Sequence, residues 1–126
     1  MERFLWICLA GALGTGVRYL IGLWVGQRLG TTFPWGTLIV NLSGCFLISF
    51  IMYMALNLAS VSATLRLALT TGFLGGLTTY SSFNYETTRL FQDGAPRSAF
   101  FNLGLTLLGC FVAGLLGLAA GRRLVG

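Results

Sequence analysis

Four apolar stretches, each of about twenty residues or more, constrain this chain more than any other feature. They run from about residue 4 to 25, 35 to 59, 65 to 90 and 98 to 120. A helix of about 20 residues crosses a bilayer core of about 30 Å at about 1.5 Å per residue. The connections between the stretches are short, so neighbouring helices are expected to be antiparallel. The sequence therefore predicts an all-α membrane protein with four transmembrane helices, forming one domain over residues 1–126.

Composition supports a membrane environment and excludes several classes of function. Of the 126 residues, 56% are hydrophobic and 9% are charged, whereas a soluble domain is about 25% charged. The net charge is +5, but apart from Arg122 and Arg123 the arginines are scattered singly, so no nucleic-acid surface is expected. There is no histidine, and no nucleophile stands beside a base, so the chain is not expected to be an enzyme.

The third stretch contains an unusual polar and glycine-rich segment, GFLGGLTTYSSF, at Gly72–Phe83. Gly75 and Gly76 make a continuous helix less favourable at this point. A break near the midplane would free backbone carbonyls, which are good cation ligands when they are buried or line a cavity. The alternative is a continuous glycine-rich packing face whose hydroxyls bond back to the preceding turn. The residues by themselves leave both interpretations open.

The residues that follow the glycines are suited to a small anion. Tyr80 and Phe83 are three positions apart and share a face if this part is helical. The edges of aromatic rings are electropositive, and the hydroxyls of Ser81 and Ser82 are hydrogen-bond donors. Neither kind of group adds a formal charge, so this segment predicts a site that holds an anion without trapping it.

Isolated polar residues also interrupt the first and second stretches. Asn41 stands in an apolar run, where it serves either as interhelical glue or as part of a polar pathway. Thr37 lies one turn before Asn41, on the same helical face. Arg18 lies deep in the first stretch, where it either extends its charged group to the interface or lines an aqueous vestibule.

Two further polar positions follow the glycine-rich segment. Glu86 lies one turn beyond Phe83, and it either joins the polar pathway or pairs with Arg89 at the interface. In the fourth stretch, Asn102 and Thr106 form a short polar stripe at positions i and i+4.

The arginines near the ends of the stretches set almost no preferred orientation. Leaving out Arg18, which lies inside the first stretch, four arginines fall on one side of the membrane and three on the other. Because the positive-inside rule barely chooses between these sides, the chain is expected to insert both ways up. Two copies then pair antiparallel around a two-fold axis in the membrane plane, an arrangement typical of transport proteins.

Three motifs resemble the Fluc (CrcB) family of bacterial fluoride channels. They are GTGVRYL at Gly14–Leu20, PWGTLIVN at Pro34–Asn41 and GFLGGLTTYSSF at Gly72–Phe83. The similarity covers essentially the whole chain, including its length and its four spans. In place of the family's phenylalanine, however, this chain has Tyr80, whose hydroxyl is expected to slow conduction while selectivity is kept.

The resemblance implies an activity and an assembly. It implies a fluoride-selective passive anion channel that exports cytoplasmic fluoride across the bacterial inner membrane. It implies an antiparallel dual-topology homodimer with two pores, so the partners are fluoride, the lipid bilayer and a second copy of the chain. A third helix broken near the midplane is implied, with a structural sodium ion at the dimer centre held by the backbone carbonyls of Gly75 and Thr78 at this break and with no organic cofactor.

The resemblance also implies roles for individual residues. Arg18 maps to an aqueous vestibule. With the polar residues of the second and fourth stretches included, the expected fluoride pathway consists of Asn41, Tyr80, Phe83, Ser81, Ser82, Thr37, Glu86 and Thr106.

Two alternatives belong to different functional classes. A four-span dual-topology exporter of the small multidrug-resistance type has a similar size, but it needs an acidic residue inside the first helix. The first stretch contains none between Phe4 and Val25, which argues against proton-coupled export. A non-conducting helical assembly subunit is the second alternative, in which the glycines serve packing and Asn41 serves as glue.

Overall fold

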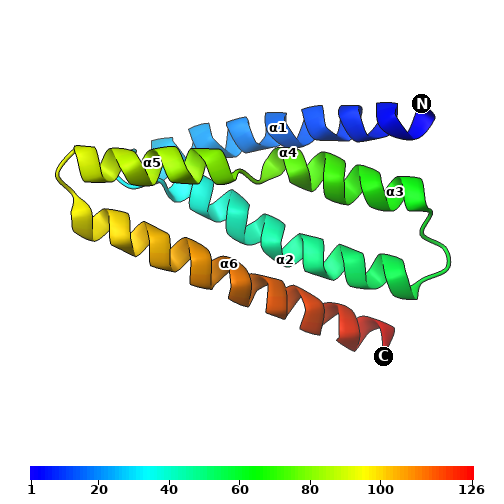
Figure 1. The fold of residues 1–126 in the computed structure, drawn as a ribbon. Helices are drawn as coiled ribbons and strands as arrows, with labels where there is room; N and C mark the ends of the chain where they lie inside the picture. The colour runs from blue at the N-terminus through cyan, green and yellow to red at the C-terminus, as the bar shows by residue number, and fades with distance from the viewer.

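The computed structural model describes every residue from Met1 to Gly126, and all of its regular elements are helical. The long helix α1 (Glu2–Leu29) leads through a short turn to α2 (Trp35–Asn57). A rod in several pieces follows, made of α3 (Ala63–Leu67), η1 (Ala68–Leu74), α4 (Gly75–Leu77) and α5 (Tyr80–Gln92). The last helix is α6 (Pro96–Val125), and Figure 1 shows that both termini lie at the same end of the bundle.

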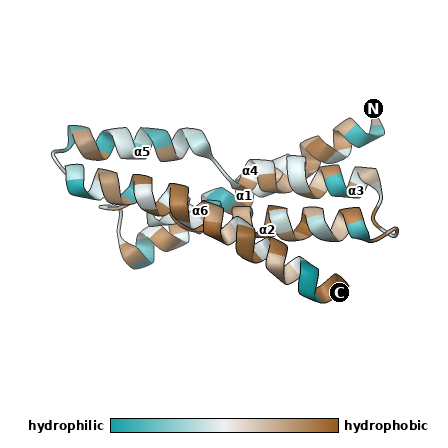
Figure 2. Ribbon diagram, turned by 60° about the horizontal axis from the view of Figure 1, so that its bottom comes forward, coloured by the Kyte–Doolittle hydropathy of each residue, from teal (hydrophilic) through white to brown (hydrophobic).

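Three helices, α1, α2 and α6, are long and apolar enough to cross a membrane. The third apolar stretch is not among them, because its helical pieces are individually short. In Figure 2, α2 and α6 are largely hydrophobic along their middles, whereas α5 carries more hydrophilic residues. The chain is therefore an all-helical membrane protein with three continuous candidate spans and one segmented rod.

Local sequence explains where the helices begin and end. Ser62 accepts a hydrogen bond from the backbone N–H of Leu65 and so caps the start of α3. Pro96 occupies the first turn of α6, where its missing N–H costs nothing. Gly30 (φ 81°) and Gly94 (φ 74°) end α1 and form the turn after α5, in a backbone conformation that favours glycine.

Close backbone contact between α1 and the segmented rod depends on glycine. A Cβ atom at Gly14 would collide with the carbonyl oxygen of Phe73, and one at Gly72 would lie 2.7 Å from the carbonyl oxygen of Ile7. The same holds between α2 and α6, where a Cβ at Gly117 would collide with the carbonyl of Phe46. Small residues let helices approach closely in a bilayer. These glycines therefore set how closely α1 packs against the segmented rod and how closely α2 packs against α6.

A small apolar core lies where α1, α2 and the segmented rod meet. Val40, Leu74 and Leu77 are fully packed there. Only 18 of 126 residues are buried, and many large apolar side chains face outward. A surface of this kind is suited to lipid and to protein partners rather than to water.

The segment before the glycines has a wider helical winding than an α-helix. Residues of η1 form a π-helical turn directly before Gly75. Such turns are often found near functional sites, because they release carbonyls and re-aim the following residues. Here the π-helical winding leads directly into the interruption of the rod.

Candidate functional site

The segmented rod is interrupted between α4 and α5. Thr78 (φ −89°, ψ 152°) and Thr79 (φ −152°, ψ 118°) have extended backbone conformations. Figure 1 shows this short linker between α4 and α5, beside the middle of α1. The backbone groups around the linker lack helical partners and need other ones.

Asn41 of α2 supplies partners for Thr79. Its Nδ2 donates to the Thr79 carbonyl oxygen at 3.1 Å, and its Oδ1 accepts from the Thr79 N–H at 2.8 Å. Asn41 is 7% exposed, so these bonds form largely out of contact with solvent. The amide therefore imitates a paired backbone group, and it keeps its second N–H free.

Three carbonyl oxygens at the end of α4 differ in the hydrogen bonds that they accept. The Gly76 oxygen accepts from Arg18 Nε of α1 at 3.0 Å. The Gly75 oxygen loses its usual donor four residues on, because the Thr79 N–H bonds to Asn41 instead. No hydrogen bond within the chain ends on the Thr78 oxygen. Gly75 itself is exposed at the surface of the chain.

The first turn of α5 carries a pair of aromatic rings. The ring centroids of Tyr80 and Phe83 lie 5.5 Å apart with an interplanar angle of 69°, so one ring presents its edge to the other. Tyr80 is 73% exposed, whereas Phe83 is 3% exposed. The prediction that these two rings share a helical face is confirmed, with the Tyr80 ring at the surface of the chain and the Phe83 ring buried.

Hydroxyl groups converge on Thr79, which the sequence analysis did not single out. The Thr79 hydroxyl accepts from the Ser82 N–H at 3.2 Å and thereby caps α5. It also donates to the Ser82 hydroxyl at 3.1 Å and lies 3.3 Å from the Ser81 hydroxyl. A threonine directly before a new helix is an N-cap signal, so the sequence contained a pointer to this role.

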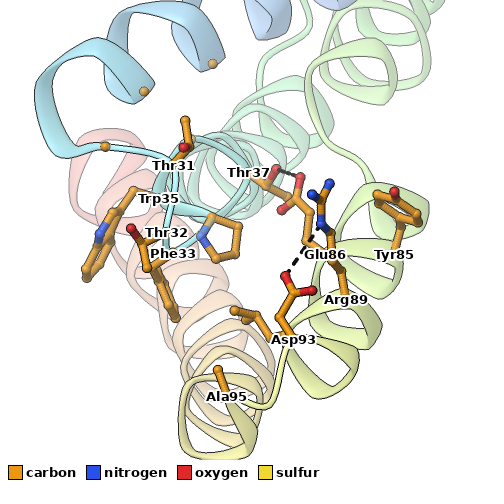
Figure 3. Close-up of a pocket in the computed structure, with 16 residues that line it drawn as sticks. Thr31, Thr32, Phe33, Trp35, Thr37, Tyr85, Glu86, Arg89, Asp93 and Ala95 are labelled. Carbon is orange, nitrogen blue, oxygen red and sulfur yellow. Dashed lines mark hydrogen bonds and ion pairs between the residues drawn. The ribbon is translucent and has the colours of Figure 1, made fainter.

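A cavity of about 660 Å³ lies between the α1–α2 turn and α5. Thr37 donates from its hydroxyl to Glu86 Oε1 at 2.8 Å on the wall of this cavity (Figure 3). The second carboxylate oxygen of Glu86 is buried and has no hydrogen-bond partner. The interpretation that pairs Glu86 with Arg89 is wrong, because Arg89 instead forms an ion pair with Asp93 at 3.7 Å.

Polar side chains of α6 form a buried chain of hydrogen bonds to α5. Asn102 Nδ2 donates to the Thr87 hydroxyl at 2.8 Å, and that hydroxyl donates to the Phe83 carbonyl oxygen at 2.7 Å. The Thr106 hydroxyl donates to Asn102 Oδ1 at 3.4 Å. Asn102, Thr87 and Thr106 are all buried, so this chain fixes α5 against α6 and holds the backbone of Phe83.

The predicted site residues thus form several separate groups of contacts. Thr37 donates a hydrogen bond to Glu86 at the cavity. Asn41 meets the linker, where Tyr80, Ser81, Ser82 and Phe83 begin α5. Arg18 bonds to a carbonyl of α4, and Thr106 joins the α6 network.

Comparison with known proteins places the chain in a family. The family model described as "CrcB-like protein, Camphor Resistance (CrcB)" matches residues 5–118. The chain belongs to the CrcB-like family. The match includes α1, α2, the segmented rod and most of α6, so every predicted site residue lies inside it.

Curated relatives of this CrcB-like chain are similar over their full lengths. A protein of Sorangium cellulosum is 48% identical over 125 residues, covering 99% of this chain and 98% of the relative. A protein of Geobacter sp. strain M21 is 46% identical over 98% of this chain and 100% of the relative. One of Anaeromyxobacter sp. strain K is 47% identical over the whole of both chains. Each of the three is named fluoride-specific ion channel FluC.

Proposed function

We propose that this chain is a fluoride-selective passive channel, and the observation that carries the proposal is the arrangement at the start of α5. There the edge-to-face rings of Tyr80 and Phe83 begin the helix beside the linked hydroxyls of Thr79, Ser81 and Ser82. Ring edges and hydroxyls stabilise an anion without formal charge. The names of relatives at 46–48% identity support fluoride as that anion.

Fluoride is small and strongly hydrated, so a narrow pathway has to replace its water with donors. The free N–H of Asn41, the hydroxyls of Ser81 and Ser82 and the ring edges of Tyr80 and Phe83 are the donors we assign. Thr37 and Glu86 lie at the cavity where the ion enters or leaves, and Thr106 belongs to the α6 hydrogen-bond network that reaches the Phe83 carbonyl through Asn102 and Thr87. Chloride is larger and fits a narrow, donor-lined passage poorly.

A sodium ion at the linker is the second part of the proposal. The residues present fit such an ion, because the Gly75 and Thr78 carbonyl oxygens accept no hydrogen bond from the linker or its neighbours. Neutral carbonyl oxygens are ligands that hard cations prefer. No group of three acidic, thiol or imidazole side chains competes as a metal site. A bound cation would supply a fixed positive charge that favours anions nearby.

The assembly we propose is an antiparallel homodimer of a single domain, residues 1–126, with two pores. Two observations support it. The chain leaves many large apolar side chains exposed, and Gly75, whose carbonyl is assigned to the ion, lies at its surface. In this assembly the segmented rod is the fourth crossing, its linker lies near the midplane and the sodium ion joins the two linkers.

The proposed cellular role is the passive exit of fluoride from the cytoplasm. Fluoride enters bacteria as neutral hydrogen fluoride and ionises in the cytoplasm, so a passive channel in the inner membrane lets it leave. The small multidrug-resistance alternative is not favoured, because α1 has no acidic residue beyond its first turn, where Glu2 lies. Ion conduction, not catalysis, is the activity.

Ion efflux from liposomes tests the proposal. Purified protein is reconstituted into vesicles loaded with potassium fluoride or potassium chloride, valinomycin is added, and an ion-selective electrode follows each anion. Release of fluoride without chloride supports a selective channel. Absence of any anion flux would favour the non-conducting assembly subunit instead.

A further inference from the structure

Arg18 has an unusual environment for a charged side chain in an apolar helix. It forms no ion pair within the chain, where the only ion pair joins Arg89 to Asp93. Its one hydrogen bond within the chain runs from Nε to the carbonyl oxygen of Gly76, at 3.0 Å. Intramembrane arginines typically bond to backbone carbonyls when they have no acidic partner. The cation of Arg18 is therefore directed at the end of α4.

The backbone of α4 is close enough for this contact because residue 76 is a glycine. A Cβ atom there would collide with the carbonyl oxygen of Gly11 and lie 2.9 Å from the N–H nitrogen of Thr15. Gly11 and Thr15 stand about two turns and one turn, respectively, before Arg18 on α1. The same face of α1 thus packs closely against Gly76 and carries the arginine that donates to the Gly76 carbonyl.

The hydrogen bond from Arg18 to Gly76 changes which carbonyl oxygens near the linker are available to bind a cation. Two side chains already occupy oxygens there, since Arg18 holds the Gly76 oxygen and Asn41 holds the Thr79 oxygen. The Thr78 oxygen accepts no hydrogen bond, and the Gly75 oxygen lacks its usual helical donor, the Thr79 N–H. Without Arg18, the Gly76 oxygen would join this free set.

We propose that Arg18 is a positioning residue for the cation site, which removes the Gly76 carbonyl from coordination and leaves the oxygens of Gly75 and Thr78 to the ion. The inference rests on the cation site of the proposed function. It assigns Arg18 a task other than lining a vestibule. The number of carbonyl dipoles that face an ion contributes to cation selectivity, so Arg18 is expected to set the preference for sodium over potassium.

Thermal unfolding of the purified full-length protein tests this inference without any transport. A ligand that binds the folded state raises the melting temperature according to its concentration. Tryptophan fluorescence would follow melting while sodium chloride or potassium chloride replaces N-methylglucamine chloride at constant ionic strength. The quantity compared is the ratio of the potassium concentration to the sodium concentration that give the same rise in melting temperature.

Arg18→Met removes the donor, and Arg28→Met is the matched control. Arg28 belongs to the same helix but lies over the ring of Trp24, 5.3 Å from its centroid, away from the linker. We expect Arg18→Met to lower the potassium-to-sodium ratio about tenfold, the scale of one charged hydrogen bond, and Arg28→Met to leave it unchanged. Arg18→Lys should fall between wild type and Arg18→Met, because an ammonium donates as a point charge without the guanidinium geometry.

An unchanged ratio in Arg18→Met would overturn the inference, and so would a wild-type protein that does not distinguish sodium from potassium. If Arg18→Met does not elute as a single folded species, Arg18→Lys decides the question by the same ratio. A protein that prefers sodium through Arg18 but does not conduct fluoride would retain this inference and overturn the proposed function. Loss of fluoride flux in Arg18→Met with an unchanged ratio would assign Arg18 to a vestibule instead.

Discussion

Asn41 and Thr79 are joined by two hydrogen bonds, although 38 residues separate them in the sequence. The side-chain amide uses both of its polar ends on one backbone unit, as a neighbouring β-strand would. These two hydrogen bonds therefore anchor the linker between α4 and α5 to α2. The orientation of the Tyr80 and Phe83 rings, which follow the linker, depends on this anchoring. Of the two roles that the sequence left as alternatives, these hydrogen bonds support interhelical glue, and the remaining N–H of Asn41 is the donor that we propose for the pathway.

Asn41→Asp tests the anchoring of the linker by Asn41. Aspartate keeps an oxygen acceptor for the Thr79 N–H but loses the donor, and it turns a second oxygen toward the Thr79 carbonyl. We expect a loss of about 1–3 kcal/mol in unfolding free energy, with fluoride flux reduced at least as strongly. Asn57→Asp is the control, because Asn57 bonds only to Tyr53 within the exposed end of α2. Equal losses in both variants, measured by denaturant unfolding and efflux, would contradict the account.

Tyr80→Phe tests the effect of the added hydroxyl. Tyr80 is exposed and forms the outer ring of the edge-to-face pair, so removal of the hydroxyl leaves the ring contact in place. We expect faster fluoride efflux with selectivity over chloride retained, because one donor that holds the ion is lost. Tyr19→Phe, an exposed tyrosine of α1, should not change the rate. A rate for Tyr80→Phe that is equal to or below wild type would refute this prediction.

Thr37→Val removes the only hydrogen bond made to the carboxylate of Glu86. Both oxygens of that group would then lack partners, because the second is already unpaired. We expect the variant to lose about 1–3 kcal/mol of stability and to conduct fluoride more slowly. Thr88→Val is the comparison, since the Thr88 hydroxyl bonds only to the carbonyl of Asn84 on an exposed face. The account would be wrong about the cavity wall if both valine variants behaved alike.

Gly14→Ala tests the contact between α1 and the segmented rod. The new methyl group would collide with the Phe73 carbonyl, which belongs to rigid backbone, so one of the two rods must shift. We expect a cost of about 1–3 kcal/mol, and more if the shift separates Arg18 from Gly76. Gly16→Ala places its methyl where no atom of the chain lies within 4 Å, so it should be neutral or gain up to about 1 kcal/mol in helix propensity. Comparable melting temperatures for the two variants would rule out this contact.

Much of the fold could be predicted because it depends on length and local chemistry. Stretches of about twenty apolar residues indicated the three long helices. Gly75 and Gly76, where the sequence left a break open, are helical in α4, and the interruption comes two residues later, at Thr78 and Thr79. The N-cap role of Thr79 was also within reach, because threonine before a helix is a local signal. The π-helical winding of η1 could not be predicted, since no residue type specifies it.

The pairs that build the site were harder to predict because they join residues far apart in the sequence. Arg18 and Gly76 are 58 residues apart, and their contact depends on how closely the glycines let α1 approach α4. Thr87 was overlooked for the same reason, since its importance comes from Asn102 across the α5–α6 interface. Local spacing suggested instead that Glu86 pairs with Arg89, a contact that Asp93 makes in its place.

Current recorded across a planar bilayer tests passive fluoride selectivity most directly. A tenfold gradient of potassium fluoride is set across the membrane, with equal chloride on both sides. The account predicts a current that reverses near the fluoride equilibrium potential, about 59 mV in magnitude for a monovalent ion, and that does not shift when chloride is raised on one side. A reversal potential that follows chloride or potassium, or no current in a bilayer that contains folded protein, would contradict it.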